Sequence, residues 1–293
     1  MSQSSEQRRL GTRDLLQFQM VDDPQVSSDG TQVAWVKSWM EADADRYRAH
    51  LYLTDLATGT TRQLTSGAGQ DTHPRWSPDG RTIAFLATVS PPEGDPEVGE
   101  ATSFRGRLPQ LFAIPASGGE PRQLTHLAGG VSEPCWSPDG RTIAFTTLTD
   151  PDRGLESLDP TATDELDPFE RFNRDVLVVD RVRWKSDSLG LLGSHYRHVA
   201  RVQFDPDASE LPQPVLLTSG RSEYTSPAWS PDGKQIAYLT YSPVPDWAVY
   251  IKPLGGGEAE RIAESGRGLS GFPAWSPDAV SYTHLTLPTK RIV

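Results

Sequence analysis

The sequence predicts an all-β fold, a β-propeller of four-stranded blades, and three observations support this prediction. A phrase of strand and turn residues recurs, as WSPDGRTIAF at 76–85 and 136–145 and as WSPDGKQIAY at 229–238. A second pair of strand-like segments around a turn follows most copies of the phrase. Glycine and proline number 25 each among 293 residues, as is usual in a turn-rich β protein. Four short strands in roughly 40–50 residues are typical of a propeller blade.

The recurring phrase predicts a β-hairpin. In its first full copy, Ser77, Pro78 and Gly80 occupy turn positions that favour these residue types. Asp79 also favours turns through local hydrogen bonds, and we prefer this interpretation to calcium binding or catalysis. A residue before a proline is pushed into an extended conformation, so the first strand ends at the turn. The β-branched, small and aromatic residues at 82–85 are typical of a buried second strand.

Two degenerate copies extend the series of hairpins. PQVSSDGTQVAW places Val26 in register with Trp76, and VRWKSDSLGLLG places Trp184 in register as well. Without Trp184 a gap of 93 residues would remain, about two units of a propeller. The sequence therefore predicts about five blades and the start of a sixth, in a ring that is not closed. The predicted blade openings lie near positions 26, 76, 136, 184, 229 and 275.

The second strand pair of each unit is predicted by hydrophobic segments on both sides of a turn. The third unit matches this plan poorly, because only DVLVVD at 175–180 resembles a strand there. Residues 12–19 predict a short helix with Thr12 as its N-cap. The predicted second pairs are 51–65, 111–125, 198–218 and 249–263.

Three regions make up the expected domain organisation. Residues 1–20 form an N-terminal segment with the short helix, and residues 21–278 form the partial propeller. After Asp278 the repeat predicts Gly and then Ile-Ala-Phe, but Ala-Val-Ser-Tyr follows instead. SYTHLTLPTKRIV resembles translated sequencing-adaptor DNA, so we expect residues 279–293 to be non-native. The alternative is a divergent strand.

Charge and composition limit the partners and the compartment. The net charge of −11 and pI of about 5.0 disfavour a nucleic-acid partner. The acidic segment 150–175 and the loop at 90–107 are expected to be surface insertions, with a recognition role as the alternative. The single cysteine, Cys135, favours a reducing compartment and a buried, inert thiol. Because we find no signal peptide and no apolar span, we expect a cytoplasmic protein without a membrane partner.

No catalytic, cofactor-binding or metal-binding residue is predicted, and no cofactor is expected. The sequence lacks a G-x-S-x-G, an H-E-x-x-H, a paired C-x-x-C and a phosphate-binding loop. GLSGF at 268–272 lacks the second glycine of a nucleophile elbow, and GGG at 255–257 lies in a turn between strands. His195 and His198 are three residues apart, which places them on opposite faces of a strand and argues against a metal pair.

Two longer segments resemble a known family. TRDLLQFQMVDDPQVSSDGTQVAWV, and VVDRVRWKSDSLGLLG followed by HVARVQF, resemble the acylaminoacyl-peptidase-like branch of the prolyl oligopeptidase family of serine peptidases. The resemblance covers about residues 12–278, whereas the WSPDG repeat alone is shared with TolB-like propellers. It implies a propeller that restricts access to an α/β-hydrolase domain with a Ser-Asp-His triad. No position of this chain matches a triad residue, so we expect the catalytic domain to be missing from this chain.

Two functions are therefore considered. The first is the substrate-gating propeller portion of a serine-type peptidase that cleaves short or acylated peptides. Its partners would be peptide substrates, reached through the missing catalytic domain. Assembly into a homo-oligomer is also considered. The alternative is a TolB-like propeller that acts as a non-catalytic protein-binding scaffold. A third class, sugar- or metal-dependent propeller enzymes, requires histidine or carboxylate clusters at equivalent blade positions, and no such cluster recurs across the units of the sequence.

Overall fold

The structure of the chain is a computed structural model. Within the residues it describes, strands dominate, and the single helix is the 3-10 helix η1 (Thr12–Gln17). The short helix is thus found where it was predicted, but its N-cap is Gly11, whose N–H donates to Asp14 Oδ2 at 2.7 Å. The described residues are 11–41, 46–67, 69–88, 108–152, 154–155, 185–186, 190–191, 195–242, 246–265, 272–276 and 282–283.

Four antiparallel sheets of four strands, called blades 1 to 4 below, make up most of the described chain. Blade 1 contains β1 (Gln19–Val26), β2 (Gln32–Glu41), β3 (Arg46–Asp55) and β4 (Thr61–Gln63). Blade 2 contains β5 (Asp71–Trp76), β6 (Thr82–Ala87), β7 (Gln110–Pro115) and β8 (Arg122–Gln123). Blade 3 contains β9 (Ser132–Trp136), β10 (Thr142–Thr149), β13 (Tyr196–Gln203) and β14 (Val215–Leu216). Blade 4 contains β15 (Glu223–Trp229), β16 (Gln235–Ser242), β17 (Asp246–Pro253) and β18 (Glu260–Ser265).

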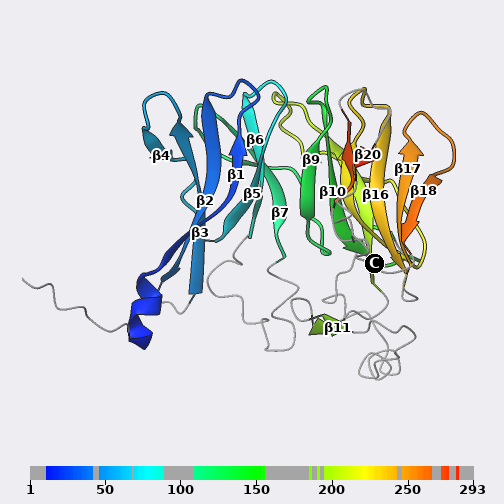
Figure 1. Cartoon of the computed structure of the whole chain (residues 1–293), viewed down its shortest axis with the longest axis horizontal. Helices are drawn as coiled ribbons and strands as arrows, with labels where there is room; N and C mark the ends of the chain where they lie inside the picture. The colour runs from blue at the N-terminus through cyan, green and yellow to red at the C-terminus, as the bar shows by residue number, and fades with distance from the viewer. Residues whose placement is uncertain are drawn as a thin grey trace, which may run out of the picture.

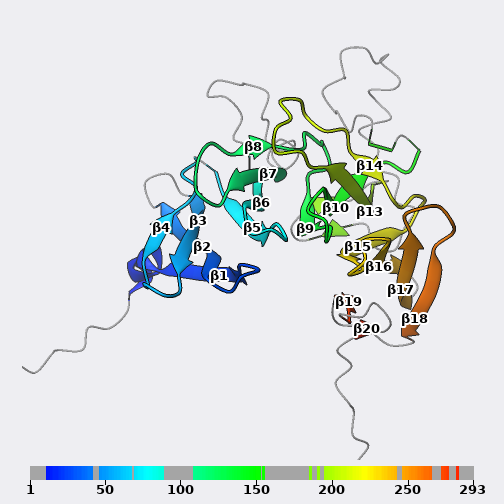
Figure 2. The same ribbon diagram turned by 90° about the horizontal axis from the view of Figure 1, so that it is seen from above.

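The blades stand side by side in an arc that is open on one side (Figures 1 and 2). Figure 2 shows β1, β5, β9 and β15 along the concave side of the arc, and β4, β8, β14 and β18 along its convex side. Beyond blade 4, β19 (Ala274–Trp275) pairs with β20 (Tyr282–Thr283) next to β15. The predicted all-β, unclosed propeller is confirmed.

The described strands form fewer blades than the sequence predicts. β13 pairs directly with β10 over eight residue pairs, from Thr142–Gln203 to Thr149–Tyr196, so residues 132–216 contribute to one blade. Among the described residues, the stretch from Trp136 to Trp229 therefore contributes one four-stranded blade, whose second and third strands are separated in sequence by residues 150–195. The described strands give four blades and the start of a fifth.

No blade opens near position 184 in the described part of the chain. There β11 (Lys185–Ser186) and β12 (Gly190–Leu191) pair only with each other, and Figure 1 shows β11 below the blades. Trp184 itself and the segment DVLVVD lie outside the described residues.

The beginning of the fifth unit keeps the register of the repeat. Trp275 pairs with Tyr282 in β20, as Trp76 pairs with Ile83 in blade 2. Tyr282 belongs to the tail that is predicted to be non-native. Most of residues 279–293 lie outside the described residues, and their origin stays a prediction.

Adjacent blades bury apolar faces against each other, because alternate residues of each strand point to opposite faces of its sheet. Between blades 1 and 2, Leu51 and Leu53 pack with Ile83, Phe85 and Ile114, and all five are nearly inaccessible to solvent. Equivalent clusters join blades 2 and 3 and blades 3 and 4. These clusters hold the inner strands at fixed positions along the concave face.

The hairpin turns are built as the sequence predicts. Ser77 Oγ donates to Asp79 Oδ1 at 2.6 Å and accepts the Thr82 N–H at 3.0 Å, and Gly80 has a φ of 69°. The Arg81 N–H also donates to Asp79 Oδ1, at 3.1 Å. Asp79 thus stabilises the turn through local hydrogen bonds, as predicted. The hydrogen bond from Ser77 holds the pKa of Asp79 below the usual range.

Candidate functional site

One polar position recurs at the concave face of all four blades. Each of these residues precedes a proline and has a positive φ, which is uncommon for residues other than glycine. We call them the inner-rim residues: Asp23 (φ 46°), His73 (φ 55°), Glu133 (φ 52°) and Ser226 (φ 57°). Strained backbone of this kind costs about 1–3 kcal/mol per residue and gathers at functional sites, so this rim is the candidate site.

A β-bulge produces the strained conformation in each inner strand. In blade 2, Thr72 pairs with Leu86 and Arg75 pairs with Ala84, so two residues of β5 oppose one residue of β6. Pro74 has no N–H and cannot donate to the ladder at this point. The same register shift occurs in β1, β9 and β15. The local signal in the sequence is x-Pro-x-Trp, which stands as HPRW, EPCW and SPAW, with DPQV as its degenerate form.

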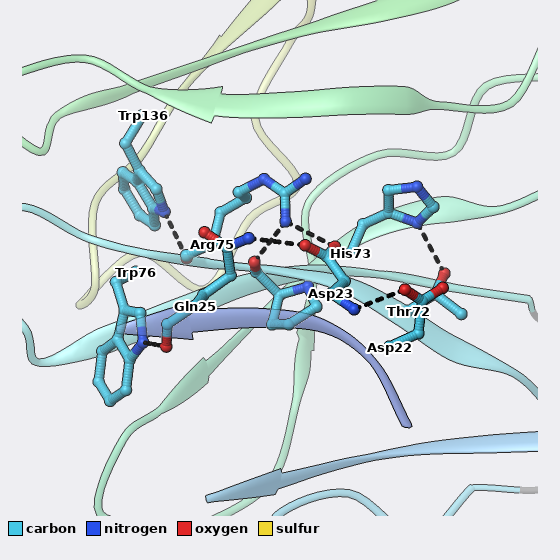
Figure 3. Close-up of polar contacts among 9 residues, drawn as sticks. Asp22, Asp23, Gln25, Thr72, His73, Arg75, Trp76 and Trp136 are labelled. Carbon is cyan, nitrogen blue, oxygen red and sulfur yellow. Dashed lines mark hydrogen bonds and ion pairs between the residues drawn. The ribbon is translucent and has the colours of Figure 1, made fainter. Parts of the chain in front are cut away.

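Between blades 1 and 2, an ion pair connects the inner rim. Arg75 Nη1 lies 2.7 Å from Asp23 Oδ2, and Gln25 Nε2 donates to Asp23 Oδ1 at 2.6 Å (Figure 3). The Asp23 N–H donates to Asp22 Oδ1 at 2.8 Å. The ion pair is partly exposed and contributes less than about 1 kcal/mol to stability. Its main effect is to fix the direction of the Asp23 carboxylate.

Between blades 3 and 4, the link is a carboxylate that accepts three hydrogen bonds. Glu133 Oε2 accepts the Ser226 N–H at 2.7 Å and the Thr146 hydroxyl at 2.8 Å. Glu133 Oε1 accepts the Ser226 hydroxyl at 3.1 Å. Bonds to an ionised acceptor are stronger than bonds between neutral groups, so this contact joins the two blades firmly.

His73 differs from the other inner-rim residues. Among the described residues, its imidazole hydrogen-bonds only Thr72 Oγ1 of its own strand, at 3.1 Å, and its side chain is exposed (Figure 3). Although the side chain is exposed, the protein on one side of the ring partly desolvates it and lowers the pKa of His73, and the Asp23 carboxylate partly opposes this effect. The ring is therefore neutral at neutral pH. A neutral imidazole can both donate and accept a hydrogen bond.

A second repeated contact holds the inner strands together. Each tryptophan that ends an inner strand donates its indole N–H to a backbone carbonyl of the preceding blade, and we call this contact the indole latch. Figure 3 shows the first two latches. The latches are Trp76 to Gln25 (2.9 Å), Trp136 to Arg75 (2.9 Å), Trp229 to Cys135 (3.2 Å) and Trp275 to Ala228 (3.0 Å).

Residues considered in the sequence analysis have structural roles where the structure describes them. The buried His198 hydrogen-bonds Thr218 Oγ1 and the Gly220 carbonyl, each at 3.0 Å, and burial lowers its pKa. Burial raises the pKa of the Cys135 thiol to about 12, and the thiol contacts the Pro227 carbonyl at 3.2 Å. In the described part of the chain, no three His, Cys, Asp or Glu side chains are grouped so that they could hold a metal ion.

The inner rim is not evident from any one residue type repeated at equivalent positions of the sequence. The four rim residues differ in type and share only their place before a proline. The x-Pro-x-Trp spacing was available in the sequence and would have located them. The segments 90–107 and 150–175 and the string GLSGF lie largely outside the described residues, so their predicted roles stay predictions.

Comparison with known proteins agrees with this architecture. The model of the TolB β-propeller domain matches residues 17–163, half of the chain, and the chain belongs to this family. The uncharacterized peptidase YuxL of Bacillus subtilis (strain 168) is 33% identical over 225 residues, which cover 77% of this chain and 30% of YuxL. The similarity to YuxL confirms the resemblance to a peptidase, and solved structures of an acylaminoacyl peptidase and a prolyl endopeptidase share the propeller fold.

Solved structures share the fold. The acylaminoacyl peptidase of Pyrococcus horikoshii aligns with a TM-score of 0.57 at 16% identity, over 85% of this chain and 33% of that chain. TolB from Acinetobacter baumannii aligns with a TM-score of 0.53 at 20% identity, over 89% of this chain and 47% of that chain. The chain thus spans 30–33% of the length of these two peptidases. In the described residues, no helix has the length and apolar character needed to cross a membrane.

Proposed function

We propose that the chain is the substrate-gating propeller portion of a serine-type peptidase that cleaves short or acylated peptides. The catalytic α/β-hydrolase domain would lie outside this chain. The observation that carries the proposal is the row of strained, polar inner-rim residues along the concave face, in a chain 33% identical to a peptidase. A cytoplasmic location is part of the proposal and is supported by the single cysteine.

The inner rim supplies both selectivity and rigidity in this proposal. A peptide that passes along the concave face would meet the exposed imidazole of His73, which can both donate and accept a hydrogen bond. The links through Asp23 and Glu133 and the indole latches resist spreading of the blades. A fixed opening admits an extended peptide and excludes a folded protein, whose diameter is larger.

The test uses the protein expressed from the whole gene. We expect a serine-reactive fluorophosphonate to label it, and we expect cleavage of short peptides but not of folded proteins. The double variant Asp23→Ala/Glu133→Ala loosens the rim and should allow cleavage of longer peptides. Arg221→Ala removes an exposed ion pair with Asp152 and serves as the control. A product that is not labelled, or a length cutoff that the double variant leaves unchanged, would overturn the proposal.

The alternative is a non-catalytic protein-binding scaffold, and membership of the TolB β-propeller family favours it. In that case the concave face would hold a partner protein rather than pass a substrate. The protein from the whole gene would then bind a partner at the concave face and show no reaction with fluorophosphonate. Fluorophosphonate labelling therefore separates the two functions in one experiment.

A further inference from the structure

A cavity of about 460 Å³ lies between the hairpin turns of blades 3 and 4. Its lining includes Arg201 and Asp139 of blade 3, and Trp229, Asp232 and Leu254 of blade 4. The volume lies within the range of roughly 300–1,000 Å³ that is usual for small-molecule sites. Charged groups from two blades thus face one space beside an aromatic and an aliphatic side chain.

Comparison of the blades shows that Arg201 is an exception. It pairs with Ala144 in the sheet ladder, and the equivalent residues of blades 1 and 2 are Leu53, which pairs with Ala34, and Ala113, which pairs with Ala84. Leu53 and Ala113 are 2% and 5% exposed and belong to the apolar cores between blades. An arginine at such a position loses hydration without gaining apolar packing, so it calls for an explanation.

The guanidinium of Arg201 has donors to offer. Among the described residues, no hydrogen bond or ion pair involves its side chain, although the residue is half-buried. An arginine carries five N–H donors and binds a carboxylate through two parallel hydrogen bonds. The Arg201 side chain is therefore available to a ligand with a carboxylate group.

The two aspartates of the lining are already partly used. Asp139 Oδ1 accepts the Ser137 hydroxyl at 2.5 Å and the Arg141 N–H at 3.0 Å. Asp232 Oδ1 makes the same contacts in its turn, while its Oδ2 lies 3.9 Å from Lys234 Nζ, beyond hydrogen-bond distance. The second carboxylate oxygens retain capacity to accept hydrogen bonds from a cation.

We propose that this cavity binds a free α-amino acid. Its carboxylate would pair with Arg201, its ammonium group would bind the carboxylates of Asp139 and Asp232, and its side chain would pack on Trp229 and Leu254. A ligand with both charges is favoured because the lining presents both signs in one space. The site lies at the turns between two blades and does not depend on the function proposed for the concave face.

The test measures binding of L-leucine by isothermal titration calorimetry to the protein expressed from the whole gene. N-acetyl-L-leucine lacks the ammonium charge and L-leucinamide lacks the carboxylate, and each should bind at least about tenfold more weakly than L-leucine. Arg201→Leu introduces the residue type that blade 1 has at the equivalent position, Leu53. It should abolish binding of L-leucine and leave the fold intact. Asp232→Asn keeps an acceptor oxygen for the turn, removes the charge, and should weaken leucine but not leucine's acetylated analogue.

Arg141→Leu is the matched control. Arg141 is an exposed arginine of the blade 3 turn that contains Asp139, and it lies outside the cavity lining. This variant should bind L-leucine like the unmodified protein. The proposal is overturned if L-leucine does not bind, if the three probes bind equally, or if Arg201→Leu binds as well as Arg141→Leu. Circular dichroism of each variant shows that a loss of binding is not a loss of structure.

Discussion

Single side chains determine how one blade meets the next. In each indole latch, a half-buried indole N–H donates to a backbone carbonyl of the preceding blade. Removal of the N–H leaves that carbonyl without its partner. An unsatisfied buried acceptor costs about 1–3 kcal/mol, which is more than the net gain from forming the bond. Most of the free-energy change in a latch variant should therefore come from the carbonyl that is left behind.

Trp136→Phe tests the latch between blades 2 and 3. The variant keeps an aromatic ring and removes the N–H that donates to the Arg75 carbonyl, so we expect about 1–3 kcal/mol of destabilisation in urea unfolding. Hydrogen exchange should become faster along β5 and β9. Trp35→Phe is the control, because Trp35 donates to Thr54 within blade 1. Equal changes in exchange for both variants would contradict a role between blades.

His198 predicts a loss of stability in mild acid. Burial lowers its folded-state pKa below the ordinary value of 6.5, so the unfolded chain binds more protons around that pH. This contribution to the free energy of unfolding is present above pH 6.5 and is lost as the pH falls through the folded pKa. His198→Gln removes the titrating ring and should flatten the dependence of the free energy of unfolding on pH. Glutamine is expected to fit there, since Gln110 occupies the equivalent position in blade 2 and accepts a hydrogen bond from Thr125 Oγ1.

Urea unfolding between pH 5 and pH 8 gives the measurement for this variant. A reduced but non-zero slope is expected, because His73 also has a lowered pKa. An unchanged slope in His198→Gln would show that the buried ring does not contribute.

Strands and turns differ in how far they could be predicted. The hairpins at 76–85, 136–145 and 229–238 were predicted correctly because Ser, Pro, Asp and Gly impose a turn through local contacts alone. The blade that contains β13 was not, since the pairing of Phe145 with Ala200 joins residues separated by a long insertion. Local propensity carries no information about which distant strand supplies the partner.

The candidate site was predictable only in part. The inner strands follow from the phrase, whereas the links of the rim depend on which blade lies next to which. Glu133 meets Ser226 only because blade 4 follows blade 3 without another blade between them. A blade assigned to Trp184 would separate these two residues, so the sequence prediction does not include their contact.

The loops that precede the inner strands allow little change. A Cβ atom on Gly129 would lie 1.9 Å from the Leu148 carbonyl oxygen, so Gly129→Ala should destabilise the fold by about 1–3 kcal/mol or more through overpacking. Gly255→Ala is the control, because no atom lies within 4 Å of its added Cβ. Thermal unfolding of both variants provides the measurement. If Gly129→Ala leaves the thermal stability unchanged, the loop can move away from the added Cβ at little cost in free energy.

An arc with an open side has two uncovered ends. At the blade 1 end, Val21 and Val26 are 66% and 59% exposed, and both lie on the face of β1 that points away from blade 2. Trp35 and Tyr52 stack on the same face, with ring centroids 5.0 Å apart. Apolar surface and an uncovered sheet favour association with other copies, so we expect the chain alone to aggregate or self-associate.

The double variant Val21→Lys/Val26→Lys tests this end face. Size-exclusion chromatography with light scattering should show concentration-dependent association of the chain and less association in the variant, because charge on the face opposes stacking. Val215→Lys is the control, since Val215 is 52% exposed but lies on the outer strand β14. A monomer at all concentrations, with one cooperative melting transition, would contradict the prediction.

The indole latches all point the same way, from each blade back to the one before it. The donor lies on the first strand of the arriving blade, so a growing chain can attach each new blade before its other strands have been made. Trp275 already reaches the Ala228 carbonyl from β19, which has two residues. We therefore expect the arc to assemble in the direction of synthesis on the ribosome. A ribosome stalled shortly after residue 275 has emerged should carry a fourth blade that resists proteolysis, and Trp275→Phe should remove that protection.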